Sequence, residues 1–404
     1  MRPPIIAMAP NSWDDAFWMN RQHLLSRLGA RGWDILYSTG RLSFWSRSEE
    51  IWRRSRYLSS FKRKNGVFID VPGKLVPEWP TLPMWEYLGL KIHAAHLRGQ
   101  RLNGNHGKNR DLILYIFHPK FFPYVKLIKP KFLVYHAYDV FALQGGWSSQ
   151  LRNYEECLLK QADLVIGTTD GIIDAFPGPT RANAVELLNA ADTKAFADAI
   201  NADCPADLVK IPHPRIGYAG RLSVKVNFPM IEEIARRRPD WHWVLLGAVS
   251  MPKSMDDAAS RRTKMAFAAC QNAENVHFLG EKPHLDVPAY AAHMDVNTMC
   301  YNSSPGWWTV AYPLKLNEYL ATGRAIVSAH LERIAHLDNM IEFADTIDEW
   351  EASLERALAG KASGTGAERQ AFAAKNSWDV RTDELHNLLH QLVYGSARKQ
   401  QNVS

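Results

Sequence analysis

The stretch YPLKLNEYLATGRAIVS, 312–328, decides the fold of the second half of the chain. Pro313 suits the first turn of a helix, where the N–H that proline lacks is not needed. The next apolar side chains recur at the i, i+3, i+4 spacing of one helix face: Leu316, Tyr319 and Leu320. Gly323 is typical of a helix C-terminus, and the apolar run 325–327 predicts a buried strand. We therefore expect a short helix that leads directly into a strand.

The N-terminus of this helix is the first candidate for chemistry. Its free backbone N–H groups and positive dipole end favour an anion, and Lys315 adds a positive charge at the same end. Glu318, one turn later, is placed to accept hydrogen bonds from hydroxyls. A ligand that carries both phosphate and sugar hydroxyls would satisfy all three features.

The length and composition predict two well-packed domains. A chain of 404 residues exceeds one ordinary core, and 46% apolar residues with 14 tryptophans argue against disorder. The four cysteines form no C-x-x-C pair, which favours reduced thiols in the cytoplasm. Prolines interrupt the short apolar start, and no 18 apolar residues run together, so we expect neither a signal peptide nor a membrane span.

Positive charge is concentrated in the first part of the chain. The net charge is +6, but residues 1–150 hold 22 Lys and Arg against 10 Asp and Glu. The remaining residues hold 26 against 32. A basic surface is therefore expected on the first domain.

Short apolar runs alternate with helical stretches, which predicts two doubly wound α/β domains. The strands expected in the first domain are 5–9, 34–38, 66–70, 111–117, 131–137, 163–168 and 184–189. Those expected in the second are 215–220, 242–247, 275–280, 295–300 and 324–329. The polar, proline-broken stretch 197–214 is the expected linker between a domain at 1–196 and one at 215–376, and 377–404 is a last helix and tail.

The turn in GYAGRLSVK, 217–225, follows the first strand of the second domain. Ligands of open α/β sheets bind outside the carboxyl ends of the strands, which is where this turn lies. Gly220 allows the backbone to approach a diphosphate, while Arg221 and Lys225 supply positive charge. An ordinary strand-to-helix turn with solvated cations fits the same residues, and the full G-x-G-x-x-G order of a dinucleotide site is absent.

VYHAYDVFALQGG, 134–146, places His136 and Asp139 at the exit of a first-domain strand. A carboxylate at this position is suited to take a proton from an attacking hydroxyl, so Asp139 is the candidate general base. A capping role for Asp139 is the alternative. We expect His136 to be a packed core histidine.

Two further segments are candidates for contacts with an acceptor or a membrane. Trp13, Asp14 and Arg21 follow the first strand, although Asp14 or Asp15 also suits a helix N-cap. The segment 44–64 mixes aromatic and basic side chains, including Trp45, Trp52, Arg53 and Arg54. This mixture suits an anionic lipid surface better than nucleic acid, because no nucleic-acid-binding motif accompanies it; a solvated face is the other interpretation.

These motifs resemble, in order, those of the two-domain GT-B nucleotide-sugar glycosyltransferases of bacterial polysaccharide assembly, near family 4 and the xanthan-type glucuronosyltransferases. NAADTKAF, 189–196, is similar to the family's N-G-V-D-x3-F, with alanine in place of glycine. Residues 154–176 resemble its E-x6-A-D-x-V-I helix and strand. PLKLNEYLATG, 313–323, is the most specific match, and the resemblance covers nearly the whole chain.

The resemblance implies a cleft between two Rossmann-like domains and a last helix, from about Trp378, that crosses back onto the first domain. It implies a nucleotide-diphosphate sugar, with a UDP-sugar favoured, held mainly by the second domain through Gly220, Arg221, Lys225, Tyr312, Pro313, Lys315 and Glu318. The acceptor would be a lipid-linked or oligosaccharide glycan on the first domain, at the cytoplasmic face of the plasma membrane, in cell-surface or exopolysaccharide synthesis. No metal or other cofactor is expected, in agreement with the lack of a D-x-D motif.

Asp139 matches the strand-end aspartate that resembles a general base in inverting members of the family. Retaining family 4 enzymes carry Glu-x7-Glu, and the first of these two positions is Val310 here. We therefore expect inversion. A catalytically silent glycan- or nucleotide-binding protein and a sugar-nucleotide epimerase are the alternatives on the same fold.

Overall fold

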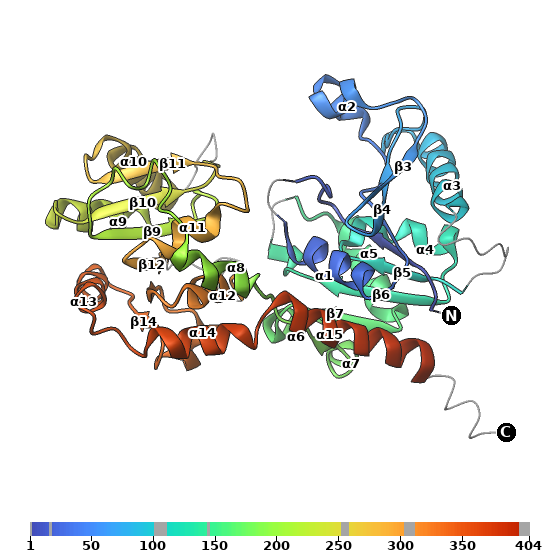
Figure 1. Ribbon diagram of the computed structural model, residues 1–404. Coiled ribbons are helices and arrows are strands. Elements are labelled where there is room, and N and C mark those ends of the chain that lie inside the picture. Colours follow the sequence, from blue (N-terminus) through green and yellow to red (C-terminus); the bar gives the residue numbers. More distant parts are fainter. Residues whose placement is uncertain are drawn as a thin grey trace. The chain divides into compact units, whose positions relative to one another are not determined.

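The structure is a computed structural model that describes residues 2–15, 18–100, 111–143, 146–251, 258–302 and 312–395. The chain divides into two compact units (Figure 1). Unit 1 consists of Met1–Leu188 and Arg381–Ser404, and unit 2 of Asn189–Val380. Each unit has its own predominantly parallel sheet, as the alternating pattern predicts.

Unit 1 is built on an eight-stranded sheet with the order β3-β4-β2-β1-β5-β6-β7-β8. β1 pairs in parallel with β2 on one side and with β5 on the other, so the topological switch point lies between β1 and β5. The strands are β1 (Ile5–Met8), β2 (Ile35–Ser38), β3 (Ser60–Lys64), β4 (Val67–Val71), β5 (Ile113–Ile116), β6 (Phe132–Ala137), β7 (Leu164–Gly167) and β8 (Val185–Glu186).

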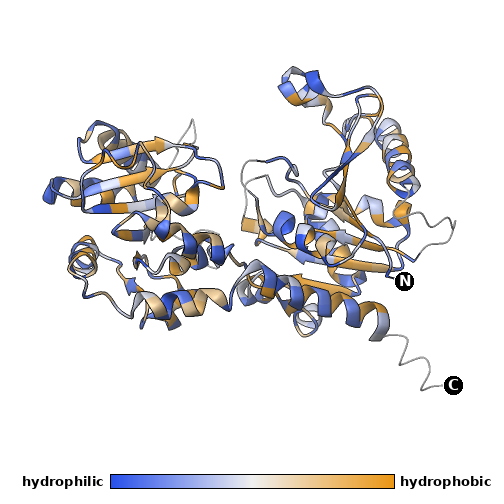
Figure 2. Cartoon of the chain, viewed as in Figure 1, coloured by the Kyte–Doolittle hydropathy of each residue, from blue (hydrophilic) through white to orange (hydrophobic). Residues whose placement is uncertain are grey.

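Short helices connect these strands, and the core lies between them and the sheet. The helices are α1 (Asn20–Ala30), α2 (Glu50–Arg54), α3 (Pro83–Gly99), α4 (Pro123–Ile128), α5 (Ser149–Gln161), α6 (Asp170–Asp174) and α7 (Gly178–Arg181). All residues of β1 and β5 are buried, and apolar strands run through the middle of both units (Figure 2). Leu97 of α3 and Leu158 of α5 pack into the same cluster as Ile6 and Leu114.

The edge strand β3 was not predicted. Its sequence SFKRK reads as a charged segment, yet it runs antiparallel to β4 at the edge of the sheet. Charged side chains suit an edge strand, because they discourage pairing with another chain. Part of the basic-aromatic segment 44–64 is therefore a component of the sheet.

Unit 2 is built on a six-stranded parallel sheet with the order β11-β10-β9-β12-β13-β14. β9 lies between β10 and β12, so the switch point of this sheet lies between β9 and β12. The strands are β9 (Arg215–Ala219), β10 (His242–Leu246), β11 (Val276–Gly280), β12 (Val296–Met299), β13 (Ala325–Ser328) and β14 (Glu342–Phe343). The helices are α8 (Thr193–Asp198), α9 (Phe228–Arg237), α10 (Ala258–Asn272), α11 (Val287–Ala292), α12 (Leu314–Thr322), α13 (Ile347–Leu358) and α14 (Gly366–Ala374).

The boundary between the units differs from the expected one. The stretch 197–214, expected to be a linker, belongs to unit 2, because Leu208 and Ile211 are buried against Val244 and Leu246 of β10. The chain passes from unit 1 to unit 2 between Leu188 and Asn189 instead. Prolines and polar residues in this stretch indicate loops, but its two buried aliphatic residues anchor those loops to a core.

The last helix, α15 (Trp378–His390), continues from unit 2 into unit 1, which contains its residues from Arg381 onward. Its Asp383 pairs with Arg31 at 2.7 Å, and His386 Nδ1 lies 3.1 Å from the indole Nε1 of Trp33. The C-terminal helix therefore packs on unit 1, as the resemblance implies.

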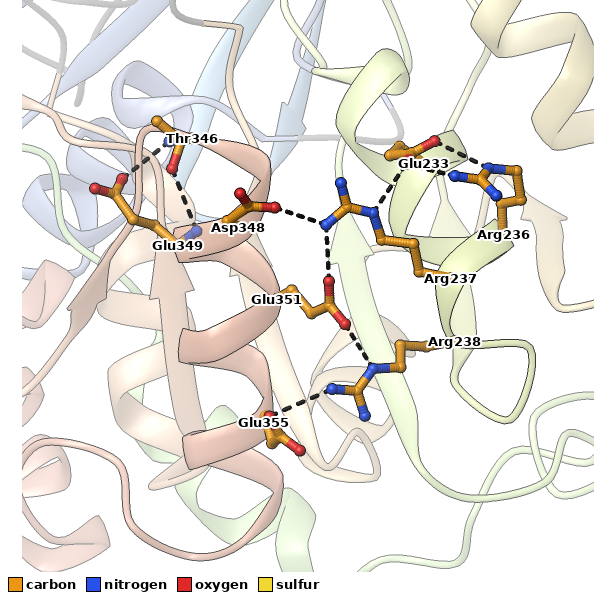
Figure 3. A network of polar contacts seen from close by, with 9 residues as sticks. All are labelled: Glu233, Arg236, Arg237, Arg238, Thr346, Asp348, Glu349, Glu351 and Glu355. Carbon is orange, nitrogen blue, oxygen red and sulfur yellow. Dashed lines mark hydrogen bonds and ion pairs between the residues drawn. The ribbon is translucent and has the colours of Figure 1, made fainter.

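A surface network of charged side chains joins α9 to α13 in unit 2 (Figure 3). Arg237 donates to Asp348 at 2.7 Å and to Glu351 at 3.0 Å, and Arg238 donates to Glu351 at 2.6 Å. These side chains lie on the outside of the unit, so the network fixes the two helices at the surface and is not a candidate for chemistry.

Candidate functional site

The turn after β9 is shaped by two glycines. Gly220 has a φ of 151°, and its N–H donates to the carbonyl of Leu246 at 2.9 Å. A Cβ at Gly247 would lie 2.1 Å from the carbonyl oxygen of Gly220, so the ends of β9 and β10 approach each other too closely for a side chain there. Arg221 follows this turn and is exposed.

Helix α12 approaches the same turn from the other side of the switch point. Leu316, Tyr319 and Leu320 are fully buried, and Gly323 ends the helix with a φ of 73°, both as predicted. The hydroxyl of Tyr319 accepts a hydrogen bond from the N–H of Ala219 at 2.8 Å, which ties α12 to the end of β9. Pro313 is the N-cap residue, one position earlier than the first-turn position expected for it.

Lys315, in the first turn of α12, is buried and reaches the glycine turn. Its Nζ lies 3.9 Å from the centre of the Tyr218 ring and 5.5 Å from that of Tyr301. A Cβ at Gly220 would lie 2.6 Å from this Nζ. The absence of a side chain at Gly220 therefore provides the space that the ammonium group occupies.

Burial and neighbouring positive charge lower the pKa values of the two lysines at this turn. Burial, reinforced by the charge of Lys225, lowers the pKa of Lys315 to about 7. Burial and the charge of Arg221 lower the pKa of Lys225 to about 8. Like charges held together in a partly desolvated place favour binding of an anion, because an anion offsets both their mutual repulsion and the cost of their burial.

Glu318 lies one turn further along α12. Burial raises the pKa of its carboxyl group to about 7, while the nearby charge of Lys315 opposes the shift. Its oxygens accept no hydrogen bond within the described part of the chain. The structure thus brings together four of the predicted donor-site residues: Arg221, Lys225, Lys315 and Glu318.

Three asparagine and tyrosine contacts hold the start of α12. The Asn189 side chain donates to the carbonyl of Tyr312 at 3.1 Å, and the Asn317 side chain donates to the carbonyl of Asn189 at 3.4 Å. The Tyr312 hydroxyl donates to the Asn317 side chain at 3.4 Å. Sequence reasoning attached no role to Asn189 beyond its place in NAADTKAF, and it did not find Tyr218 or Tyr301, which look like ordinary buried strand residues.

The candidate base Asp139 lies two residues after β6, at the carboxyl edge of the unit 1 sheet, and is partly exposed. His136 is a core histidine as expected: it is fully buried, its Nδ1 lies 2.9 Å from the Tyr115 hydroxyl, and burial lowers its pKa to about 3. Asp139 remains the candidate with access to a substrate.

Arg21 packs on Tyr138, the residue that precedes Asp139. The Arg21 guanidinium is only 2% exposed, and its carbon lies 4.2 Å from the centre of the Tyr138 ring. It donates to the side chain of Asn11, and its Nε has no hydrogen-bond partner in the described residues. Burial lowers the pKa of Arg21, and this effect outweighs the opposing influence of the neighbouring tyrosines and Asp15.

Sequence reasoning missed His118, which lies two residues after β5 at the switch point of unit 1. Burial, then the charges of Lys120 and Arg21, lowers its pKa to about 4, so the ring is neutral near pH 7. Its position after a strand that neighbours β6 is the signal that was available in the sequence.

Trp13 and Asp14, both candidates for contacts with an acceptor or a membrane, differ in exposure: Trp13 is buried and Asp14 is exposed. Trp13 is buried against Tyr37, with ring centres 5.0 Å apart. Burial tends to raise the pKa of Asp14, but hydrogen bonds from Lys62 and Lys64 of β3 outweigh it and lower the pKa. Neither aspartate of this loop caps α1, since the N-cap residue is Met19.

The aromatic and basic residues of 44–64 lie at the edge of unit 1 formed by β3. Trp45 is exposed and Trp52 is half-buried, while Arg53 and Arg54 of α2 are exposed. Arg54 forms an ion pair with Glu50 of the same helix.

Among the described residues, no helix is long and apolar enough to cross a bilayer, and no three His, Cys, Asp or Glu side chains group as a metal site. Val310, the position that bears on inversion, lies outside the described residues.

Several solved structures share the fold of nearly the whole chain. Sucrose-phosphate synthase from Thermosynechococcus elongatus matches 98% of this chain and 100% of its own chain, with a TM-score of 0.69 and 14% identity. HepE from Anabaena, in complex with UDP and glucose, matches 96% and 99%, with a TM-score of 0.66 and 15% identity. The trehalose-phosphate synthase of Burkholderia vietnamiensis matches 97% of both chains, with a TM-score of 0.66 and 13% identity.

The chain has the GT-B fold. Unit 1 is the N-terminal Rossmann-like domain of this GT-B chain and unit 2 the C-terminal one. No protein-family model matches the sequence. A Bacillus subtilis protein named as a teichuronic acid biosynthesis glycosyltransferase, TuaH, is 31% identical over 116 residues. This match covers 29% of the chain and only about a quarter, 26%, of that relative.

Proposed function

We propose that this GT-B chain is a glycosyltransferase that moves a sugar from a nucleoside-diphosphate sugar, with a UDP-sugar favoured, to a hydroxyl of a lipid-linked or oligosaccharide acceptor. The observation that carries the proposal is the position of Lys315 Nζ, which meets the glycine turn after β9 beside Lys225 and Arg221. This cluster lies at the switch point of unit 2, where α/β sheets bind their ligands.

The cluster suits a leaving diphosphate. Negative charge on the diphosphate grows as its bond to the sugar C1 breaks, so ammonium and guanidinium groups already held in place stabilise the transition state more than the ground state. Glu318 supplies oxygens for the ribose or sugar hydroxyls, as the GT-B resemblance implies. Lys315, Lys225 and Arg221 supply the positive charge in this scheme, so we propose that the reaction needs no metal ion.

We assign the general base to Asp139. Its carboxylate takes the proton of the acceptor hydroxyl as the oxygen forms its bond to C1, while the bonding pair between C1 and the donor oxygen leaves with the diphosphate. One displacement of this kind inverts the configuration at C1. Valine at position 310, where retaining family 4 enzymes have a glutamate, supports inversion.

The acceptor is proposed to be membrane-associated. The excess of Lys and Arg in residues 1–150 favours an anionic surface, and the partial relative TuaH is named for teichuronic acid biosynthesis. We propose that the protein works in cell-surface or exopolysaccharide synthesis, as a peripheral protein at the cytoplasmic face of the plasma membrane.

A transfer assay tests the proposal. The purified chain is incubated with radiolabelled UDP-, GDP- and dTDP-sugars and a lipid extract, and the label in the lipid fraction and the released nucleotide are measured. We expect label transfer with one donor, together with equal release of its nucleoside diphosphate. Nucleotide binding without release from any donor would indicate a silent binding protein, and conversion of the donor without acceptor would indicate an epimerase.

A further inference from the structure

The outward face of α3 is an apolar stripe in a helix whose other face is already buried. Met84 is 88% exposed, Tyr87 59% and Leu88 51%, and Ile92 continues the stripe at helical spacing. The inner face, with Ala94 and Leu97, packs into the core of unit 1. A helix that is apolar on both faces needs a partner for the outer one.

Specific contacts fix which face of α3 points outward. His93 Nε2 lies 2.9 Å from the Asp70 carboxylate of β4, and His93 Nδ1 lies 2.8 Å from the Tyr124 hydroxyl of α4. Near the start of the helix, Glu86 pairs with the buried Arg41, and Trp85 Nε1 donates to the carbonyl of Pro77 at 3.1 Å. The stripe is thus a stable feature of the surface.

Exposed apolar side chains also occur in the segments that precede α3. Ten of the twelve exposed large hydrophobic side chains in the described part of unit 1 lie between Trp45 and Ile92. Backbone hydrogen bonds from Lys74 to Arg56 and from Leu75 to Tyr57, both at 2.9 Å, hold the loop that carries exposed Tyr57 and Leu58. Figure 1 shows α2 and α3 at the outer edge of the sheet, beside β3 and β4.

Basic side chains accompany this apolar surface. Residues 45–92 contain nine Lys and Arg against five Asp and Glu. Of the acidic residues, Asp70 is buried, and Glu86 and Glu50 pair with Arg41 and Arg54. Lys91 lies over the Tyr87 ring, with its Nζ 5.2 Å from the ring centre, so positive charge reaches the stripe itself.

We infer that the outward face of α3 is the apolar anchor by which unit 1 binds an anionic lipid bilayer, while Arg47, Arg53, Arg56, Arg63 and Lys74 supply the electrostatic attraction. Lys62 and Lys64 pair with Asp14, and Arg54 pairs with Glu50. A face of Met, Tyr, Leu and Ile inserts at the acyl boundary, and Lys and Arg remain at the level of the anionic headgroups. Of the two tryptophans that the sequence pattern pointed to, Trp45 is exposed and Trp52 is half-buried. This inference rests on the proposed function, which includes a lipid-linked acceptor. Its test measures lipid binding alone, so the inference and the proposed function can fail separately.

The test is co-sedimentation of the full chain with vesicles of phosphatidylcholine, with or without about one-third phosphatidylglycerol. We expect binding to the anionic vesicles that weakens with salt. Met84→Gln with Leu88→Gln should reduce the partition coefficient at least about tenfold, because two apolar side chains no longer insert. Arg53→Gln should reduce it about fivefold.

Met265→Gln in α10 of unit 2 is the matched control, since Met265 is 74% exposed on a helix outside this surface. It should bind vesicles like the wild-type chain, and all variants should keep wild-type UDP affinity. Wild-type vesicle binding by the α3 double variant would overturn the inference. The inference would also be overturned if the wild-type chain does not bind vesicles but forms a dimer in sedimentation equilibrium, and the α3 double variant is a monomer. A second copy of the chain would then cover the stripe. If the wild-type chain does not bind UDP, that result would count against the proposed function instead.

Discussion

The carboxyl edges of the two sheets carry different chemistry. In unit 2, the turn after β9 gathers like charges: the charge of Lys225 helps burial to lower the pKa of Lys315, and the charge of Arg221 does the same for Lys225. In unit 1, the corresponding edge carries the carboxylate of Asp139, neutral His118 and one arginine packed on Tyr138. Both edges are the carboxyl edges of predominantly parallel sheets, so the backbone alone does not explain the difference.

The difference indicates which reactant each unit handles. A concentration of buried positive charge is costly without an anion, which suits a unit that binds a diphosphate. A partly exposed carboxylate at the carboxyl edge of the sheet suits a unit that receives a hydroxyl and takes its proton.

Asp139→Asn should separate transfer from donor binding. The amide cannot take the proton of the acceptor hydroxyl, so the transfer rate should fall by about 10²–10⁴. The Kd for UDP, measured by calorimetry, should stay unchanged because Asp139 belongs to unit 1. A transfer rate near that of the wild type would remove Asp139 from the mechanism.

Lys315→Ala should damage both functions of unit 2. Loss of one preorganised cation at the leaving group should lower kcat by roughly 10²–10³ and weaken UDP binding. Lys264→Ala, at an exposed position of α10, is the control and should have no effect. Unchanged UDP affinity in the Lys315 variant would place the diphosphate elsewhere.

Gly220→Ala tests whether the glycine makes room for Lys315. The new Cβ would lie 2.6 Å from Lys315 Nζ, so the ammonium group must move, and UDP affinity should fall about tenfold. Gly360→Ala also has a positive φ, of 70°, but its Cβ would meet nothing within 4 Å. Both variants should lose on the order of 1 kcal/mol of stability, and only the Gly220 variant should lose affinity.

The pH dependence of UDP binding tests the shifted pKa of Lys315. In the free protein this pKa is about 7, so the side chain loses its proton as the pH rises above 7. The diphosphate binds the protonated form, so binding takes up a proton and the affinity falls by at most about tenfold per pH unit between pH 7 and pH 9. Calorimetry in two buffers with different heats of ionisation measures this uptake.

Glu318 titrates in the same range, since its pKa is raised to about 7, so Glu318→Gln is needed as a control. In that variant the proton uptake at pH 8 should persist, whereas Lys315→Arg should reduce it to the part that Lys225, with a pKa of about 8, contributes. Uptake that is unchanged in Lys315→Arg would assign the proton to another group.

Elements with strong local signals were predictable from the sequence. The α12 stop at Gly323 and the apolar strands of both sheets depend on neighbouring residues, and the structure confirms them. The edge strand β3 was missed because its side chains, including Lys62 and Lys64, are suited to water; its hydrogen bonds come from β4, which the segment itself does not reveal. The stretch 197–214 was misread because two buried aliphatic residues among prolines give no periodicity.

The candidate site follows the same rule. Arg221, Lys225, Lys315 and Glu318 were identified because charged residues beside a glycine turn or a helix start stand out in a sequence. Tyr218 and Tyr301, which lie beside Lys315, were missed because their strands come together only through the β9–β12 pairing. Asn189 is separated from Tyr312 by 123 positions, and no local pattern reports a contact of that range.

The central claim is that unit 2 recognises a diphosphate through positive charge at the glycine turn. Thermal unfolding of the full chain with equal millimolar concentrations of UDP, UMP and uridine tests it most directly, because ligands that bind the native state raise the melting temperature. The account predicts a clear increase with UDP, a smaller one with UMP, little with uridine, and loss of the UDP effect in Lys315→Ala. No increase with UDP, or an equal increase with uridine, would contradict it.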